Sequence, residues 1–197
     1  MCSDHSIRPT FEHSNISPFL ERQGWTRRVA GEADFNAAVR AINEMVRTGR
    51  GLLVSGEYGV GKSALAAAVA KAFAPVFKVR LAVPSDLERL RRDWQDYWAI
   101  NPYTQNVWLD DLGAEPFVNA YGVKTEAAGD FIVTWHELHA AGVRLIVTTN
   151  LSANELDARY GGRVFSRLKD LCVPLRLTGT DKRRWSRGTL TTEGGAR

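Results

Sequence analysis

The chain has 197 residues, 44% of them hydrophobic and 24% charged, which are ordinary values for one globular domain with short extensions. No apolar run approaches the roughly 18 residues of a membrane span, and the N-terminus lacks the apolar stretch of a signal peptide, so we expect a cytoplasmic protein without a membrane partner. The net charge of +4 is compatible with a nucleic-acid partner, and Cys2 and Cys172 are expected to be free thiols.

The first third of the chain contains an irregular arm and then a helix. Residues 1–33 show no clear period, and we expect an N-terminal arm that is a candidate partner-binding segment, with one short helix near 18–23. Its aromatic residues argue for docking on the core or on a partner, and a disordered tail is the alternative. From Asp34, apolar residues recur at helical spacing, with Asp34 as the expected N-cap and Gly49 as the stop.

Next comes a glycine-rich phosphate-binding pattern between a strand and a helix. The apolar run 51–55 predicts a buried strand, and residues 64–73 are strong helix formers. The loop between them has the P-loop spacing, formed by Gly56, Glu57, Tyr58, Gly59, Val60, Gly61, Lys62 and Ser63. Its N–H groups and the helix N-terminus are expected to bind phosphates. Lys62 would reach the β- and γ-phosphates of a nucleotide, and the Ser63 hydroxyl would bind Mg²⁺.

Strands and helices alternate through the remainder of the chain. Further strands are expected at 76–83, 107–111, 143–150 and 173–178. Helices are expected after Ser85-Asp86, over about 124–140, from a capping box of Ser152 with Glu155, and over about 163–171. The stretch between 111 and 124 reads as a loop. This order predicts an α/β fold whose five-stranded parallel sheet is sandwiched by helices.

Polar groups follow several of these strands, and the carboxyl ends of parallel strands meet at one edge of the sheet. Asp110 is expected to hold Mg²⁺ through water, and Asp111 to orient or deprotonate the attacking water. Asn150 is expected to hydrogen-bond that water or the γ-phosphate, and Glu115 is a weaker acidic candidate. The predicted activity is therefore that of an ATPase with ATP and Mg²⁺ as cofactors.

Two later basic groups leave alternatives open. Arg163 and Arg167 share one helix face, either as solvated surface or as an arginine finger that enters the site of a neighbouring subunit. Residues 181–187 place cations around Trp185, a composition typical of phosphate contact with base stacking, or of a charged terminus.

Taken together, the motifs over about 35–187 resemble the DnaC/DnaI/IstB group of AAA+ ATPases, which are helicase loaders and transposition helpers. The resemblance is carried by the P-loop and by the segments 109–115, 146–151, 160–168 and 179–183. It implies an AAA+ core at 34–187 without a C-terminal helical lid, followed by a flexible tail at 188–197. It also implies that Asn150 is sensor 1, Arg167 the arginine finger and Arg183 a sensor-2-type, nucleotide-binding residue.

The implied function is a DNA-replication ATPase of the helicase-loader type. It would self-associate on ATP and DNA, contact single-stranded DNA, and deliver or remodel a hexameric replicative helicase of the DnaB type. An IstB-like transposition helper, acting on duplex DNA with a transposase, is the first alternative. A small-molecule P-loop kinase is a third reading, against which the residues Asp110, Asp111 and Asn150 argue.

Overall fold

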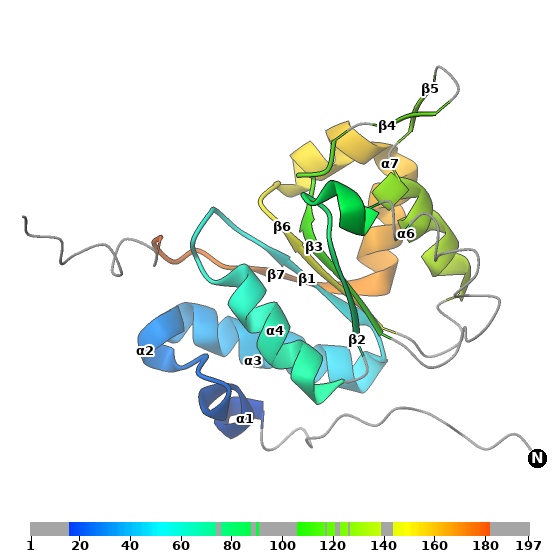
Figure 1. Ribbon diagram of the computed structural model, residues 1–197. Coiled ribbons are helices and arrows are strands. Elements are labelled where there is room, and N and C mark those ends of the chain that lie inside the picture. Colours follow the sequence, from blue (N-terminus) through cyan, green and yellow to red (C-terminus); the bar gives the residue numbers. More distant parts are fainter. Residues whose placement is uncertain are drawn as a thin grey trace, which may run out of the picture.

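A computed structural model describes residues 16–73, 76–87, 90, 106–116, 118–120, 123–125, 127–138 and 144–181. Its centre is a parallel sheet of five strands in the order β2-β3-β6-β1-β7 (Figure 1). The strands are β1 (Gly51–Ser55), β2 (Val76–Arg80), β3 (Asn106–Leu112), β6 (Leu145–Thr149) and β7 (Cys172–Arg176). The five-stranded parallel sheet predicted from the sequence is confirmed.

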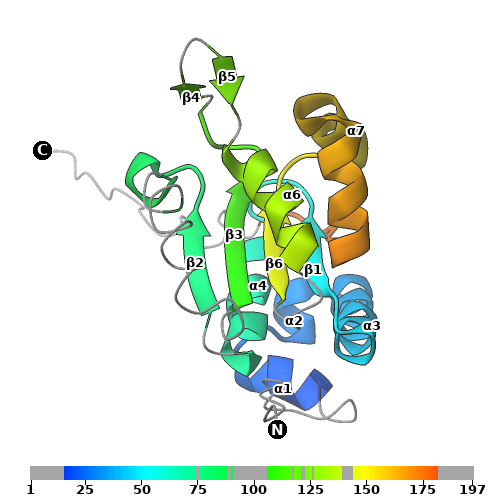
Figure 2. The same ribbon diagram turned by 90° about the vertical axis from the view of Figure 1, so that its right-hand side faces the viewer.

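Helices cover both faces of this sheet (Figures 1 and 2). The helices α3 (Glu32–Thr48) and α4 (Lys62–Ala72) lie on one face, while α6 (Ala127–Leu138) and α7 (Ala153–Leu171) lie on the other. The alternation of side chains along β1 shows why two layers form: Leu52 and Val54 belong to the first core, and Leu53 belongs to the second. In the described part of the chain, no helix is long and apolar enough to span a membrane.

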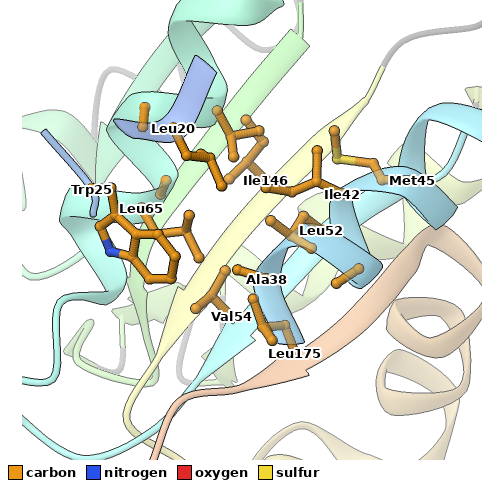
Figure 3. Close-up of a cluster of buried hydrophobic side chains, with 14 of the residues drawn as sticks. Leu20, Trp25, Ala38, Ile42, Met45, Leu52, Val54, Leu65, Ile146 and Leu175 are labelled. Carbon is orange, nitrogen blue, oxygen red and sulfur yellow. The ribbon is translucent and has the colours of Figure 1, made fainter. Parts of the chain in front are cut away.

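The N-terminal segment is part of the first core. The short helices α1 (Ile16–Arg22) and α2 (Arg27–Ala30) pack beside α3, and Leu20 and Trp25 lie among the side chains of that core (Figure 3). The Trp25 ring stacks on Phe35, with the ring centroids 5.7 Å apart. The expected helix near 18–23 is therefore present, and the aromatic side chains of Phe19 and Trp25 dock on the core. Residues 1–15 lie outside the described part.

The start of α3 differs from the prediction. Its N-cap is Gly31, and Asp34 lies inside the first turn with only 5% of its surface exposed. The Asp34 carboxylate accepts hydrogen bonds from the backbone N–H groups of Thr178 and Gly179 at 2.9 to 3.1 Å, which draws it away from a capping role. The expected stop at Gly49 is confirmed, since this residue is left-handed and closes the helix.

Three other local predictions are corrected. The loop predicted between 111 and 124 contains an antiparallel hairpin of β4 (Val118–Ala120) and β5 (Val123–Thr125). The helix predicted after Ser85-Asp86 already begins at residue 84. Asp86 therefore lies inside this helix, and its carboxylate pairs with Arg80. The two helices predicted after Ser152 form the single element α7, which is kinked at Gly161, while the capping box of Ser152 with Glu155 is confirmed.

Cys172 is a free, buried thiol at the start of β7. Burial in the second core is the main cause that raises its pKa to about 12, and the nearby charge of Arg50 opposes this in part. The expectation of a free thiol holds for Cys172, and Cys2 lies outside the described residues.

Candidate nucleotide-binding site

The predicted P-loop lies between β1 and α4, at the carboxyl edge of the sheet. The side chain of Lys62 is folded back onto this loop, where its Nζ donates to the carbonyl oxygens of Gly56 and Glu57 at 2.8 and 2.6 Å. Residue 62 is the first of α4, so the helix N-terminus and the ammonium group concentrate positive charge at one place. A loop of this kind binds anionic phosphate groups.

Asp110 is the centre of a polar network between three elements. Its Oδ1 accepts hydrogen bonds from Ser63 Oγ at 3.0 Å and from Thr148 Oγ1 at 2.7 Å. Its Oδ2 lies 2.8 Å from Lys78 Nζ on the edge strand β2. The structure thus brings together the two residues predicted to hold Mg²⁺, Ser63 and Asp110, and adds a cation on the carboxylate.

A bulge at the end of β3 explains how two consecutive carboxylates reach one site. Successive residues of a strand point to opposite faces, so Asp111 would normally turn away from Asp110. The pairing of β3 with β6 shifts between Leu109 and Leu112, and Asp111 adopts a left-handed backbone with φ of 63°. The Asp111 N–H donates to Thr148 Oγ1 at 2.9 Å, which fixes the turn. Both carboxylates therefore face the P-loop side.

A cleft of about 420 Å³ joins these residues. Its lining consists of Tyr58, Gly59, Gly61, Lys62, Ser63, Ala64, Asp111 and Asn150. Asn150 follows β6 directly, as predicted, and reaches this cleft together with Asp111 and the P-loop. The predicted convergence of three strand ends on one site is therefore present in the fold.

The chain after β7 runs along the P-loop. The N–H of Leu177 donates to the Ser55 carbonyl at 2.9 Å, and a Cβ atom at Gly59 would overlap the carboxylate of Asp181. Gly59 also has a φ of 80°, so both its backbone and its neighbour demand glycine. The Asp34 carboxylate secures this crossing through Thr178. Arg183, predicted as a sensor-2-type residue, lies outside the described residues.

Glu115, predicted from the sequence as a weaker acidic candidate for the site, is engaged in a structural contact. It is buried, and its carboxylate accepts from the Gly113 N–H at 2.9 Å and from the Tyr160 hydroxyl. Arg159 donates to its backbone carbonyl at 2.7 Å. Arg159 and Tyr160 belong to α7, so Glu115 connects the loop after β3 to that helix. It is not among the residues that line the cleft.

Arg163 and Arg167 lie in the second half of α7, after the kink. Arg163 is exposed, while Arg167 is partly buried and its NH1 lies 3.5 Å from the Arg163 carbonyl oxygen. Within the described part of the chain, neither residue lines the cleft beside Lys62. The described cleft is therefore formed without either arginine.

Four residues of the site region were missed from the sequence. They are Asp34, Lys78, Thr148 and Asp181, and each acts through a contact with a distant part of the chain. Thr148 carried a weak signal, because it is a hydroxyl residue near the end of a strand that was already assigned to the site. Asp34 was interpreted as a helix cap, and Asp181 fell within the segment 179–183 that carries the family resemblance, whereas Lys78 carried no local signal.

The donor set fits a hard divalent cation. Mg²⁺ prefers oxygen ligands and keeps several waters, and the Ser63 hydroxyl and the Asp110 carboxylate present such oxygens next to the phosphate-binding loop. A bound Mg²⁺ would neutralise charge that develops on a transferring phosphoryl group. Asp111 and Asn150 would orient water in the cleft, and Lys62 would bind phosphate oxygens.

Comparison with solved structures bears on the fold alone. No family model and no curated protein matches the sequence. Domain III of the replication initiation protein DnaA from Thermotoga maritima superposes with a TM-score of 0.51 and 19% identity, over 76% of this chain and 64% of that one. The chain thus spans less than two thirds of that domain's length. PCH-2 from C. elegans gives a TM-score of 0.44 and 12% identity, over 81% of this chain and 42% of that one. The protein therefore shares the fold of that DnaA domain, with a five-stranded parallel sheet and a P-loop between β1 and α4.

Proposed function

We propose that this protein binds ATP with Mg²⁺, hydrolyses ATP in a site shared between subunits, and acts in DNA replication as a helicase loader. One observation carries the proposal. The P-loop, Asp111 and Asn150 line one cleft and Asp110 is bound to Ser63 of that lining, while Arg167 lies on α7 outside the cleft. A cleft that has phosphate- and metal-binding groups, and no arginine among its described lining residues, fits an ATPase completed by a neighbouring subunit.

The shared site gives each residue a role. Lys62 and Ser63 bind the phosphates and Mg²⁺, Asp110 holds the ion, and Asp111 polarises the attacking water with help from Asn150. Arg167 of one subunit stabilises the γ-phosphate bound to the next. Arg183 is proposed to contact the nucleotide, since Asp181, two residues before it, already lies against the P-loop.

The partners belong to the same proposal. The net charge of +4 and the resemblance to helicase loaders favour single-stranded DNA and a hexameric replicative helicase, with residues 1–33 as a candidate contact. The fold shared with a domain of a replication initiation protein fits this role. A transposition helper that acts with a transposase on duplex DNA is the alternative with the same core. Pull-downs against a replicative helicase and against a transposase distinguish the two.

A subunit-mixing experiment tests the shared site. Arg167→Ala is expected to lower the single-stranded-DNA-stimulated ATPase rate by roughly 10³-fold, the range of a lost arginine finger. Lys62→Ala is expected to abolish activity by itself, because it removes the cation that binds the phosphates. Mixing the two inactive variants should restore part of the rate, since mixed pairs contain one intact P-loop facing one intact arginine.

Arg163→Ala is the matched control, as Arg163 lies one turn away on the same helix. It is expected to keep most of the activity. If Arg163→Ala is inactive and Arg167→Ala is active, the roles of the two arginines are exchanged. A rate per subunit that is independent of protein concentration, with consumption of a small acceptor, would instead establish the kinase reading.

A further inference from the structure

Lys78 occupies an unusual place for an edge-strand lysine. Its Nζ lies 2.8 Å from Asp110 Oδ2 and 3.7 Å from the centre of the Trp108 ring. Lys78 and Trp108 are directly paired across β2 and β3, and Asp110 is the next residue on the same face of β3. The ammonium is therefore held by a carboxylate and by the face of an aromatic ring, two partners that both favour a cation.

The second cation of this strand is engaged elsewhere. Arg80 makes a two-point contact with Asp86, with Nε to Oδ2 at 2.8 Å and NH2 to Oδ1 at 3.2 Å. The contact with Asp86 is the main cause that raises the pKa of Arg80, and the charge of Asp110 adds to it. Lys78 is thus the cation whose described contacts bear directly on Asp110.

The same carboxylate faces the P-loop. While Oδ2 meets Lys78, Oδ1 is bound to Ser63 Oγ, the hydroxyl placed for Mg²⁺. The side chain of Asp110 is only 10% exposed, whereas that of Lys78 is 39% exposed. The carboxylate is therefore fixed by its surroundings, and the lysine is the partner that has room to move into solvent.

We propose that Lys78 is a built-in competitor of Mg²⁺ for Asp110, which sets the magnesium concentration at which the nucleotide is bound firmly. In the arrangement seen here, the ammonium neutralises the carboxylate. An ion held on the Oδ1 side would weaken the hold of Oδ2 on the ammonium and favour its movement into solvent, because two cations repel each other at one carboxylate. The Trp108 ring keeps the displaced lysine close. This inference rests on the proposed binding of Mg²⁺ and nucleotide at the P-loop.

Magnesium titrations of nucleotide binding test the inference. Binding of a fluorescent ADP analogue is measured at increasing Mg²⁺ for the wild-type protein, Lys78→Met and Lys78→Arg. Removal of one positive charge next to a divalent ion is expected to lower the half-saturating Mg²⁺ concentration about tenfold in Lys78→Met. Lys78→Arg keeps the positive charge, so its half-saturating Mg²⁺ concentration should stay well above that of Lys78→Met.

Lys71→Met is the matched control, because it removes the same charge from the last turn of α4, at the end of that helix far from the P-loop. Its magnesium dependence should equal that of wild type. A second measurement follows the wild-type protein directly: the NMR signal of ¹³C-methylated Lys78, assigned by its absence in Lys78→Arg, should shift when Mg²⁺ is added to the ADP-bound protein.

The outcomes separate the two proposals. If wild type binds the analogue and Lys78→Met has the same magnesium dependence or needs more Mg²⁺, the competitor role is wrong and the nucleotide site stands. An unchanged Lys78 signal on magnesium addition also overturns it. If wild type binds no nucleotide at any Mg²⁺ concentration, the proposed function fails, and this inference fails with it.

Discussion

A single buried carboxylate, that of Asp34, connects the first long helix to the segment that crosses the P-loop. It accepts hydrogen bonds from the N–H groups of Thr178 and Gly179 and from the Thr178 hydroxyl at 2.9 to 3.1 Å. A buried backbone N–H without an acceptor is costly, so the carboxylate satisfies donors that the sheet leaves open after β7. Asp34 therefore holds the approach to the nucleotide site in place.

Replacement of Asp34 should reveal this role. Asp34→Ala is expected to lower the free energy of unfolding by roughly 2–4 kcal/mol, because charged hydrogen bonds are lost and buried N–H groups are left unpaired. Asp34→Asn keeps one acceptor oxygen and should lose less. Urea unfolding measures both, with the exposed Asp157→Ala as the control. Equal stability of Asp34→Ala and the control would show that Asp34 contributes nothing to the fold.

At the scale of the element, the kink of α7 separates two halves of the helix that have different contacts. Its first half is tied to the loop after β3 through the bond from Tyr160 to Glu115, and its second half carries Arg163 and Arg167. Gly161 between them has φ of 78° and ψ of 158°, a region closed to side chains. The kink thus sets the orientation of the second half of α7, which carries both arginines.

Two adjacent glycines allow a matched test. Gly161→Ala is expected to lower the free energy of unfolding by about 1–3 kcal/mol through backbone strain, although open space surrounds the position. Gly162→Ala lies in helical backbone with ordinary spacing to Asp157, and should be neutral or stabilise by up to about 1 kcal/mol. Denaturation curves of the two variants decide the matter. Similar stability of both would mean that α7 can straighten without cost.

At the scale of the whole molecule, the N-terminal helices belong to the domain. Trp25 is 2% exposed and stacks on Phe35, and the guanidinium of Arg27 lies 4.5 Å from the centre of the Phe35 ring. These contacts join α1, α2 and α3 in the core that also supports the P-loop helix (Figure 3). The segment should therefore unfold together with the sheet.

Replacement of Trp25 tests whether the N-terminal helices unfold together with the sheet. Trp25→Ala is expected to cost about 3–5 kcal/mol of unfolding free energy, the range for a large buried aromatic side chain. Val29→Ala, at a position 46% exposed, should change it by less than about 0.5 kcal/mol. Circular dichroism and tryptophan fluorescence should report one shared transition. An early, separate transition in the fluorescence would show that α1 and α2 form an independent unit.

Much of the fold and half of the site were predictable because their signals lie within short stretches. The P-loop spacing, the apolar strands and the capping box of Ser152 each involve only neighbouring residues, and all three were identified. The prediction of a loop between 111 and 124 was wrong because a short hairpin lacks a strong apolar pattern in the sequence. The prediction that Asp34 caps a helix was wrong because its carboxylate accepts hydrogen bonds from residues 144 and 145 positions away in the sequence.

By itself, the sequence determined the parallel α/β core and placed Lys62, Ser63, Asp110, Asp111 and Asn150 at the ends of its strands, since hydrophobic period and motif spacing are local properties. Only the tertiary structure decided which groups surround those residues. The bulge that turns Asp111, the Lys78 ammonium on Asp110 and the crossing held by Asp34 all depend on which strands and helices become neighbours. Contacts of that kind are set by packing of the whole chain, and no short stretch of residues encodes them.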